Sequence, residues 1–254
     1  MPDAALQGRV ALITAASRGI GRAIAERLAA DGAFVCLTAR RAEGLDEEVV
    51  AIGRDRAIAV AGAADDPAHR EEVFARIEEE FGRLDILVNN AGINPVFGPL
   101  AGLDLDAARK ILEVNVIGTL AWTQAALRSG LGAQSEQAAV VNLASVTGQV
   151  PSPGIGWYGV SKAAVAHLTR TLSVELAPRV RVNAVAPAVV KTRFARALYE
   201  GREEEVTADY PLGRLGVPDD VAAAVAYLCS DGAAWVTGQV LTLDGGLLNA
   251  GGTA

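Results

Sequence analysis

The chain has 254 residues, of which 51% are hydrophobic, and its formal net charge is −7. Its basic residues are scattered and no apolar stretch reaches the roughly 20 residues that cross a bilayer, so neither nucleic-acid binding nor a membrane span is predicted. The two histidines, His69 and His167, are not at a metal-ligand spacing, which leaves a zinc site or a serine–histidine–aspartate hydrolase poorly supported. The length and apolar content fit one α/β domain over residues 1–254.

The N-terminal segment and the two cysteines indicate a cytoplasmic protein. The segment M-P-D-A-A-L-Q-G-R-V has no basic region followed by an apolar one, which is the pattern of a secretion signal. Cys36 and Cys229 both lie in apolar segments, where buried reduced thiols are expected rather than a disulfide.

Short apolar runs that contain β-branched residues recur along the chain and predict strands. They occupy residues 9–14, 34–38, 57–61, 85–89, 138–144, 180–186 and 239–243. Helical patterns separate them, as in 67–81, where apolar side chains recur on one stripe. Alternating strands and helices predict a doubly wound parallel sheet with right-handed crossovers.

Two segments fall outside this alternation. Residues 129–137 are polar and glycine-containing, and predict a surface loop before the fifth strand. Residues 188–215 carry Phe194, Leu198 and Tyr199, and predict either a lid over the substrate or a plain packing insertion.

A glycine turn follows the first predicted strand. The sequence T-A-A-S-R-G-I-G (14–21) leads from that strand into a helical pattern, which ends at Asp31 and Gly32. Backbone N–H groups at the start of such a helix bind a pyrophosphate, and Gly19 and Gly21 permit its close approach. Strand, turn and helix in this order therefore predict a dinucleotide site.

Tyr158, Lys162 and Ser145 form a candidate proton-transfer group. Tyr158 and Lys162 are one helical turn apart in Y-G-V-S-K, so their side chains project from the same helix face. A lysine ammonium beside a phenol favours the phenolate, so we expect Lys162 to lower the pKa of Tyr158 from its usual value of roughly 10. Ser145, upstream in N-L-A-S-V-T-G, can donate a hydrogen bond to a carbonyl oxygen that the phenol protonates.

With these motifs the chain resembles the short-chain dehydrogenase/reductase family over essentially its whole length. The resemblance rests on the glycine turn, N-N-A-G (89–92), Asn115 in E-V-N-V, Ser145, Y-G-V-S-K (158–162) and V-N-A-V-A-P (182–187). The segment A-G-I-N-P-V-F-G-P-L is similar to the branch of carbonyl and retinal reductases, and to ketoacyl-carrier-protein reductases. The resemblance implies a Rossmann-type fold, a homotetramer or homodimer, and hydride exchange between NAD(P)(H) and a small carbonyl or alcohol.

The resemblance also implies roles for individual residues. Tyr158 is the general acid in reduction and the base in oxidation, and Ser145 bonds the carbonyl oxygen. Lys162 holds the nicotinamide ribose, and Asn115 anchors a water that passes protons to Lys162. The positions that match the family's cofactor site are Ala15, Ser17, Arg18, Gly19, Ile20, Gly21, Arg40, Arg41, Ala63, Ala64, Asn90, Ala91, Gly92, Tyr158, Lys162, Pro187, Val190 and Thr192. Those expected to line an apolar substrate pocket are Val96, Phe97, Val146, Val150, Pro151, Trp157, Phe194 and Leu198.

Charge indicates which dinucleotide is used. A ribose 2′-hydroxyl is recognised by an acidic residue at the end of the second strand, whereas a 2′-phosphate is recognised by arginine. Here Arg40 and Arg41 end that strand, and Arg18 lies in the glycine turn. Because arginine binds phosphate in bidentate fashion, NADP(H) is favoured over NAD(H).

Three positions depart from the family pattern. Ala15 replaces the first glycine of the turn, and we expect it to have a negative φ, at which alanine costs little. Ala63 stands where an aspartate is common, so adenine binding is expected to rest on the backbone. Ala188 replaces a glycine after Pro187.

The leading hypothesis is an NADPH-dependent reductase of modest-sized, largely apolar ketones or aldehydes. One alternative is a 3-oxoacyl-(acyl-carrier-protein) reductase, in which Arg179 would help to bind the acidic carrier while Glu136 and the net charge of −7 would repel it. Another is a non-catalytic nucleotide-binding scaffold, which the complete catalytic set argues against.

Overall fold

Seven parallel strands form a central sheet in the computed structural model, which describes residues 5–134 and 138–251. They are β1 (Val10–Thr14), β2 (Phe34–Ala39), β3 (Ala57–Ala61), β4 (Ile86–Asn89), β5 (Ala138–Leu143), β6 (Val180–Pro187) and β7 (Val240–Leu243). Their order across the sheet is β3-β2-β1-β4-β5-β6-β7. All seven predicted strands are confirmed to within one residue at each end, and so is the parallel doubly wound sheet.

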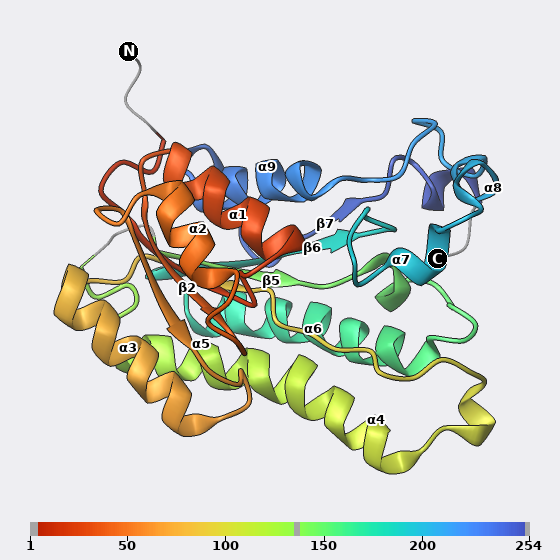
Figure 1. Ribbon diagram of the computed structural model, residues 1–254, viewed down its shortest axis with the longest axis horizontal. Coiled ribbons are helices and arrows are strands. Elements are labelled where there is room, and N and C mark those ends of the chain that lie inside the picture. Colours follow the sequence, from red (N-terminus) through yellow and green to blue (C-terminus); the bar gives the residue numbers. More distant parts are fainter. Residues whose placement is uncertain (1–4, 135–137, 252–254) are drawn as a thin grey trace.

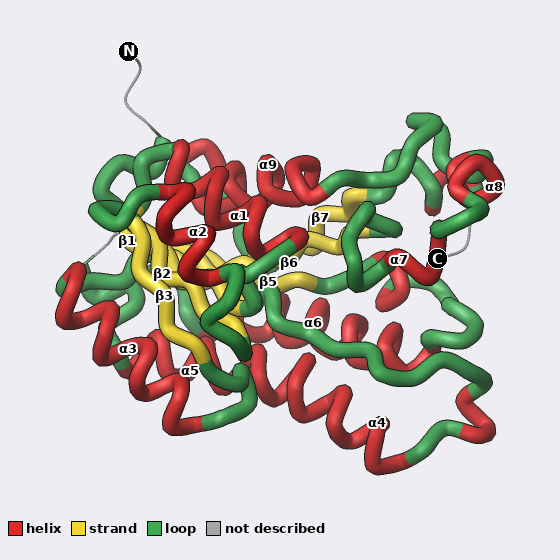
Figure 2. The backbone as a smooth tube through the Cα atoms, viewed as in Figure 1, coloured by secondary structure: helices red, strands yellow, loops and turns green. Residues whose placement is uncertain are grey.

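Helices cover both faces of this sheet (Figures 1 and 2). One face carries α1 (Gly19–Ala30), α2 (Leu45–Ile52) and α9 (Pro218–Cys229). The other carries α3 (Pro67–Phe81), α5 (Gly118–Arg128) and α6 (Gly156–Glu175), with α4 (Leu105–Leu112) packed beside α6. The helix predicted over 67–81 is confirmed. Within the described ranges, no helix has the length and apolar character that a bilayer span requires.

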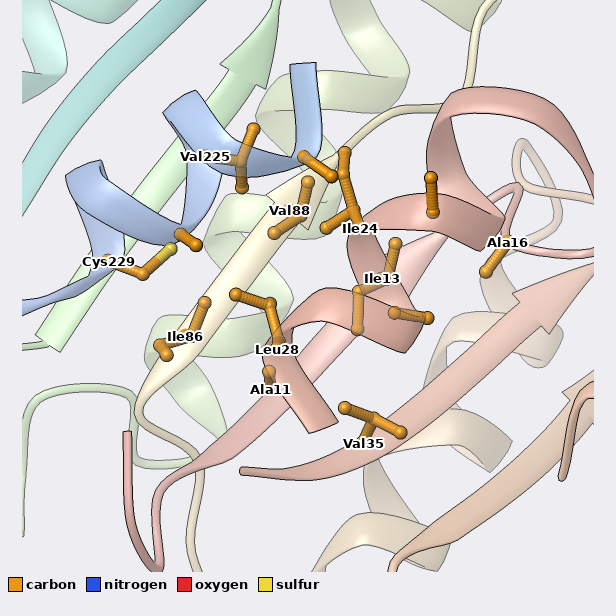
Figure 3. Packing of buried hydrophobic residues seen from close by; sticks show 14 of the residues in the cluster. Ala11, Ile13, Ala16, Ile24, Leu28, Val35, Ile86, Val88, Val225 and Cys229 are labelled. Atoms are coloured by element: carbon orange, nitrogen blue, oxygen red, sulfur yellow. The ribbon is translucent and has the colours of Figure 1, made fainter. Parts of the chain in front are cut away.

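Strand residues alternate between two cores. Successive side chains of a strand point to opposite faces of the sheet. In β1, Ala11 and Ile13 lie in the core beneath α1 and α9, which also contains Ile24 and Val225 (Figure 3). Leu12 lies in the core on the opposite face, beneath α3, α5 and α6. Because both faces are covered, the strands are continuous apolar runs rather than alternating ones.

The two cysteines lie in these separate cores. Cys229 belongs to the core beneath α1 and α9, and Cys36 to the core on the opposite face. Both thiols are free and buried, as predicted. Burial raises the pKa of each to about 12, so neither is a thiolate near neutral pH.

The segment 188–215 lies beyond the ends to which β6 and β7 point (Figure 1). It contains the short helices α7 (Arg196–Tyr199) and α8 (Glu203–Thr207). Tyr210 and Leu215 of this segment form a small core of their own with Leu247. The segment is therefore anchored by its own packing.

One predicted loop and one predicted segment extend past the described ranges. Residues 129–134 form turns after α5, as predicted, but they do not all lie at the surface, because Leu131 is buried in the core beneath α3, α5 and α6. Residues 135–137, with Glu136 among them, and residues 1–4 of the N-terminal segment lie outside the described residues.

The strand order reverses between β1 and β4. The chain runs outward from β1 to β2 and β3, and then crosses back to β4. Ligands of such sheets bind outside the carboxyl ends of the strands at this point. Just beyond the carboxyl ends of β1, β2, β4, β5 and β6 lie Ala15, Arg40, Asn90, Ser145 and Ala188. The fold therefore brings together the loops that carry the predicted site.

Candidate active site

Hydrogen bonds between Thr14 and Asn90 join the loops that follow β1 and β4. The Thr14 hydroxyl accepts from the backbone N–H groups of Asn90 and Ala91, at 2.9 and 3.0 Å. The Asn90 carboxamide donates to the carbonyl oxygens of Thr14 and Ala15, at 2.9 and 3.1 Å. An ideal Cβ at Gly21 would lie 2.5 Å from both the Ala15 oxygen and the Asn90 amide nitrogen. Glycine is therefore required at position 21, because any side chain there would keep α1 away from the hydrogen bonds that join the two loops.

Ala15 has a φ of 54° and is the one non-glycine residue with a positive φ in the described part of the chain. The expectation of a negative φ is therefore wrong. Hydrogen bonds hold the peptide groups on both sides of this residue. Asn90 donates to the Thr14 and Ala15 carbonyl oxygens, and the Ala16 N–H donates to the Thr38 oxygen at 3.0 Å. The left-handed conformation costs an alanine about 1–2 kcal/mol, which these tertiary contacts outweigh.

The start of α1 fits an anion. Its first-turn N–H groups have no partner within the helix, the N-cap residue Arg18 makes no side-chain cap, and the first turn holds no acidic residue. An ideal Cβ at Gly19 would lie 3.4 Å from the Thr192 methyl carbon, so the segment after β6 faces the glycine turn. These features suit a dinucleotide pyrophosphate at the helix N-terminus.

Three arginines next to this turn have no counter-charge. Arg18 lies in the turn, and Arg40 and Arg41 follow β2 directly. All three side chains are exposed, and none forms an ion pair with another described residue. No acidic residue lies at the tip of β2. This charge distribution fits a 2′-phosphate better than a 2′-hydroxyl.

The loop after β3, which carries Ala63 and Ala64, is held by side chains of the protein itself. The Ala64 oxygen accepts from the Trp122 ring N–H at 2.9 Å and from Arg70 at 3.1 Å. Asp65 in the same loop forms an ion pair with Lys110. The loop is fixed without a ligand, and its contact with adenine stays a prediction.

The short helix η3 (Val146–Gly148) packs directly on α6. An ideal Cβ at Gly148 would lie 2.7 Å from an α6 backbone nitrogen, and one at Gly159 would lie 2.5 Å from the Thr147 oxygen. Because both positions are glycines, the two backbones can touch. Ser145, the N-cap residue of η3, is thereby brought to the helix that carries Tyr158.

Lys162 is buried beneath Tyr158. Its ammonium nitrogen donates to the Leu143 oxygen at 2.6 Å and lies 5.5 Å from the centroid of the Tyr158 ring. An ideal Cβ at Gly92 would lie 3.4 Å from the same nitrogen. The glycine of N-N-A-G therefore leaves the ammonium reachable from the loop after β4.

Burial sets the protonation of both groups. It lowers the pKa of Lys162 to about 8 and raises the pKa of Tyr158 well above its usual range. The expectation that Lys162 lowers the pKa of Tyr158 is therefore wrong for this structure. The physical reason is that the ammonium is directed to the Leu143 oxygen and lies against the ring, so the loss of solvent dominates at the phenol.

Asn115 lies in a π-helical turn, η2 (Glu113–Ile117), between α4 and α5. Its side-chain oxygen accepts from the Ile93 N–H at 2.8 Å, and its nitrogen donates to the Ile93 oxygen and the Ser161 hydroxyl, both at 3.0 Å. Single π-helical turns are frequent at functional sites. Asn115 thus fixes the loop after β4 against α6, while its role in anchoring a water stays a prediction.

An apolar cavity of about 400 Å³ opens beside Tyr158. Of the predicted substrate residues, Val96, Phe97 and Trp157 line it together with Tyr158. Val150 and Pro151 line a neighbouring hollow of about 750 Å³, which shares Phe97 with the cavity. The predicted lining residues are thus divided between two hollows.

The remaining predicted residues lie elsewhere. Val146 is buried in η3, and Leu198 lines neither hollow. Phe194 is 58% exposed, with its ring centroid 6.1 Å from that of Tyr158. The prediction missed Asn94 and several lining residues from 98–104 and 154–156, although Asn94 belongs to the segment on which the branch resemblance rests.

Three comparisons with known proteins bear on this geometry. A family model described as enoyl-(acyl carrier protein) reductase matches residues 14–248. The chain is 38% identical over 250 residues to dehydrogenase/reductase SDR family member 4 of Caenorhabditis elegans, covering 95% of each chain. The chain belongs to the short-chain dehydrogenase/reductase family. The human protein of the same name is 38% identical over 253 residues, covering 95% of this chain and 88% of the human one.

A solved structure agrees with this family assignment. The short-chain dehydrogenase/reductase of Brucella melitensis described as a glucose/ribitol dehydrogenase superposes with a TM-score of 0.91. It is 34% identical and covers 96% of this chain and 98% of its own. Membership of the short-chain dehydrogenase/reductase family makes the chain an oxidoreductase that uses NAD(P)(H).

The conformation of Ala15 predicts that Ala15→Gly stabilises the protein. Removing the strain of a positive φ should raise the free energy of unfolding by about 1 kcal/mol, or the Tm by roughly 2–4 °C. Thermal unfolding followed by circular dichroism measures the shift. Ala16→Gly is the matched control. Ala16 is buried and has no positive φ, so removing its methyl group should lower the Tm. A fall in Tm for Ala15→Gly would contradict the strain.

The pKa of Lys162 predicts the pH profile. The ammonium is charged below about pH 8 and neutral above it, so kcat/KM for carbonyl reduction should be level up to pH 7 and fall about tenfold per unit above pH 8. The Lys162→Arg variant is slower but cannot lose its charge in this range, so its profile should not bend there. A wild-type profile that is level to pH 9.5 would show that carbonyl reduction does not depend on the charge of the Lys162 ammonium.

Proposed function

We propose that the protein reduces ketones or aldehydes to alcohols with NADPH. The observation that carries this proposal is the position of Tyr158, whose ring lines an apolar cavity while the buried ammonium of Lys162 lies 5.5 Å from the same ring. Ligand sites of this kind combine apolar walls with a few polar groups that fix orientation. Tyr158 is thus the one acid that lies between the catalytic lysine and the cavity in the described structure.

NADPH would be held by three groups of residues. The N–H groups at Gly19 to Gly21 would bind the pyrophosphate, and Arg18, Arg40 and Arg41 would bind the 2′-phosphate. Lys162 would bind the nicotinamide ribose. When bound, the nicotinamide supplies the hydride that adds to the carbonyl carbon. The absence of a side chain at Gly92, next to the Lys162 nitrogen, supports this arrangement.

The proton comes from the chain itself. Tyr158 donates its hydroxyl proton to the carbonyl oxygen as the alcohol forms. Ser145 donates a hydrogen bond to the same oxygen, for which its hydroxyl leaves a weak 3.4 Å contact with the Pro187 oxygen. Lys162 keeps a positive charge 5.5 Å from the ring, but burial outweighs the effect of that charge on the pKa of Tyr158.

Burial raises the pKa of Tyr158, so the phenol is protonated at neutral pH and has a proton to donate. We assign the segment 188–215 a lid role above this site, because the exposed ring of Phe194 lies beside that of Tyr158.

The carrier-protein alternative gains little support from the fold. Arg179 directly precedes β6, so it lies at the amino end of a strand whose carboxyl end carries Pro187, next to the site. A strand rises ~3.3 Å per residue, which separates Arg179 from this edge by roughly 25 Å. Arg179 is thus at the wrong end of the sheet to bind a carrier whose acyl group reaches Tyr158.

Loss of the phenol should abolish chemistry but not cofactor binding. We expect Tyr158→Phe to lower kcat for ketone reduction by at least ~100-fold, the usual scale of general acid catalysis. NADPH binding, followed by fluorescence titration, should change little because Lys162 and the glycine turn remain. The matched control is Tyr227→Phe, since Tyr227 is a half-exposed tyrosine of α9, away from the cavity. Near-full activity of Tyr158→Phe would disprove the mechanism.

Removing two arginines should change the cofactor preference. Each charge-assisted hydrogen bond to a phosphate contributes roughly 1.5–3 kcal/mol. The double variant Arg18→Ala/Arg40→Ala should therefore bind NADPH at least ~100-fold more weakly, whereas its affinity for NADH should hardly change.

A second double variant separates local from overall charge. Arg54→Ala/Arg179→Ala removes the same net charge from exposed residues that precede β3 and β6, at the amino ends of the strands. It should leave both dissociation constants unchanged. A wild type that already prefers NADH would contradict the assignment to NADPH.

A further inference from the structure

The cavity beside Tyr158 contains few polar side chains. They are Asn94, Asp104, Trp157 and Tyr158. Asp104 is an exposed N-cap residue whose carboxylate accepts from two backbone N–H groups of α4, at 2.7 and 2.9 Å. The Trp157 ring N–H donates to the Ala108 oxygen at 3.0 Å. Asn94 and Tyr158 are therefore the two that remain for a ligand.

The side chain of Asn94 forms no hydrogen bond within the described residues. Its side-chain oxygen is shielded from solvent and unpaired, and its nitrogen forms no hydrogen bond with any residue of the described ranges. Native proteins pair the large majority of their buried polar groups, so the unpaired oxygen is unusual. The nitrogen of the same amide is not shielded, and it is free to donate to a ligand in the cavity.

The backbone beside Asn94 is rigid. The preceding residue, Ile93, has both its N–H and its carbonyl oxygen bonded to the Asn115 carboxamide, at 2.8 and 3.0 Å. Gly92, one residue earlier, lies against the Lys162 ammonium. Asn94 is thus held in a fixed relation to the catalytic group, as a residue that reads a substrate must be.

We infer that Asn94 binds a hydroxyl group of the substrate, and so selects hydroxy ketones and hydroxy aldehydes whose remaining surface is apolar. The inference rests on the proposed carbonyl reduction. The amide nitrogen is the end that is not shielded, and it can donate to the oxygen of a substrate hydroxyl. The walls formed by Val96, Phe97 and Trp157 take the apolar part.

If this assignment is correct, Asn94 determines which substrates are preferred and is not required for the reduction of every ketone. A site that hydrogen-bonds a substrate hydroxyl discriminates against the analogue without it, because its own polar group is then left unpaired. Acetophenone and 2-hydroxyacetophenone form a suitable pair, since they differ by that hydroxyl alone. The wild type should have a KM at least ~5-fold lower for the hydroxy ketone.

The decisive measurement is the ratio of kcat/KM for 2-hydroxyacetophenone to kcat/KM for acetophenone. Asn94→Leu, which keeps the approximate volume but removes both polar atoms, should lower this ratio at least ~10-fold. Asn94→Ser, which keeps a hydrogen-bonding group, should retain part of it. Val96→Ala, in the same cavity but without a polar atom, should alter both rates and leave the ratio within ~2-fold.

Each other outcome overturns the inference. An unchanged ratio in Asn94→Leu would show that Asn94 only supports the loop, even if both rates fall. Equal wild-type KM values for the two ketones would have the same meaning and do not depend on how any variant folds. A wild type that reduces neither ketone, nor any other in a wider panel, would instead show that the proposed function is wrong.

Discussion

The hydrogen bonds between Thr14 and Asn90 are the constraint on which the cofactor side of the molecule depends. They join β1 and β4 where the strand order reverses, so they determine how far apart the two loops lie at the carboxyl edge. The Asn90 carboxamide occupies the space that a side chain at Gly21 would need. It thereby decides how closely α1 approaches the edge and where its N-terminus can meet an anion. Each bond is modest, but leaving these groups unpaired would be costly.

The same hydrogen bonds explain the strained backbone of Ala15. Ala15 keeps a positive φ because its carbonyl oxygen is bound by Asn90 and the next N–H is bound to β2. The cost of about 1–2 kcal/mol is small beside several tertiary hydrogen bonds that a relaxed backbone would lose. Strain of this size persists where the surroundings over-determine the conformation, which is typical of functional turns.

At the proposed catalytic residues, Tyr158 and Lys162, burial is the dominant effect, whereas hydrogen bonding is the dominant effect at the glycine turn. Removing solvent from Tyr158 and Lys162 favours the neutral form of each group. A neutral phenol suits proton donation, whereas a lysine with a pKa of about 8 keeps most of its charge at neutral pH. Two contacts hold the loops around this pair: the hydrogen bonds from Asn115 to Ile93, and the close approach of Gly148 to the backbone of α6. A neutral phenol and a charged lysine are the protonation states that the proposed reduction requires.

The sequence by itself determined the seven strands, the order of the motifs and the one-turn spacing of Tyr158 and Lys162, because these follow from local periodicity and residue type. Only the tertiary structure decided the φ of Ala15, the direction of the Tyr158 pKa and the unpaired state of Asn94. Each of these depends on groups that are distant in the chain. The φ of Ala15 depends on the hydrogen bond from Asn90, and the pKa of Tyr158 depends on the burial of its phenol. The position of Asn94 depends on the hydrogen bonds that Asn115 forms with the neighbouring Ile93. Sequence patterns record spacing along the chain, whereas strain, desolvation and missing partners arise from packing in space.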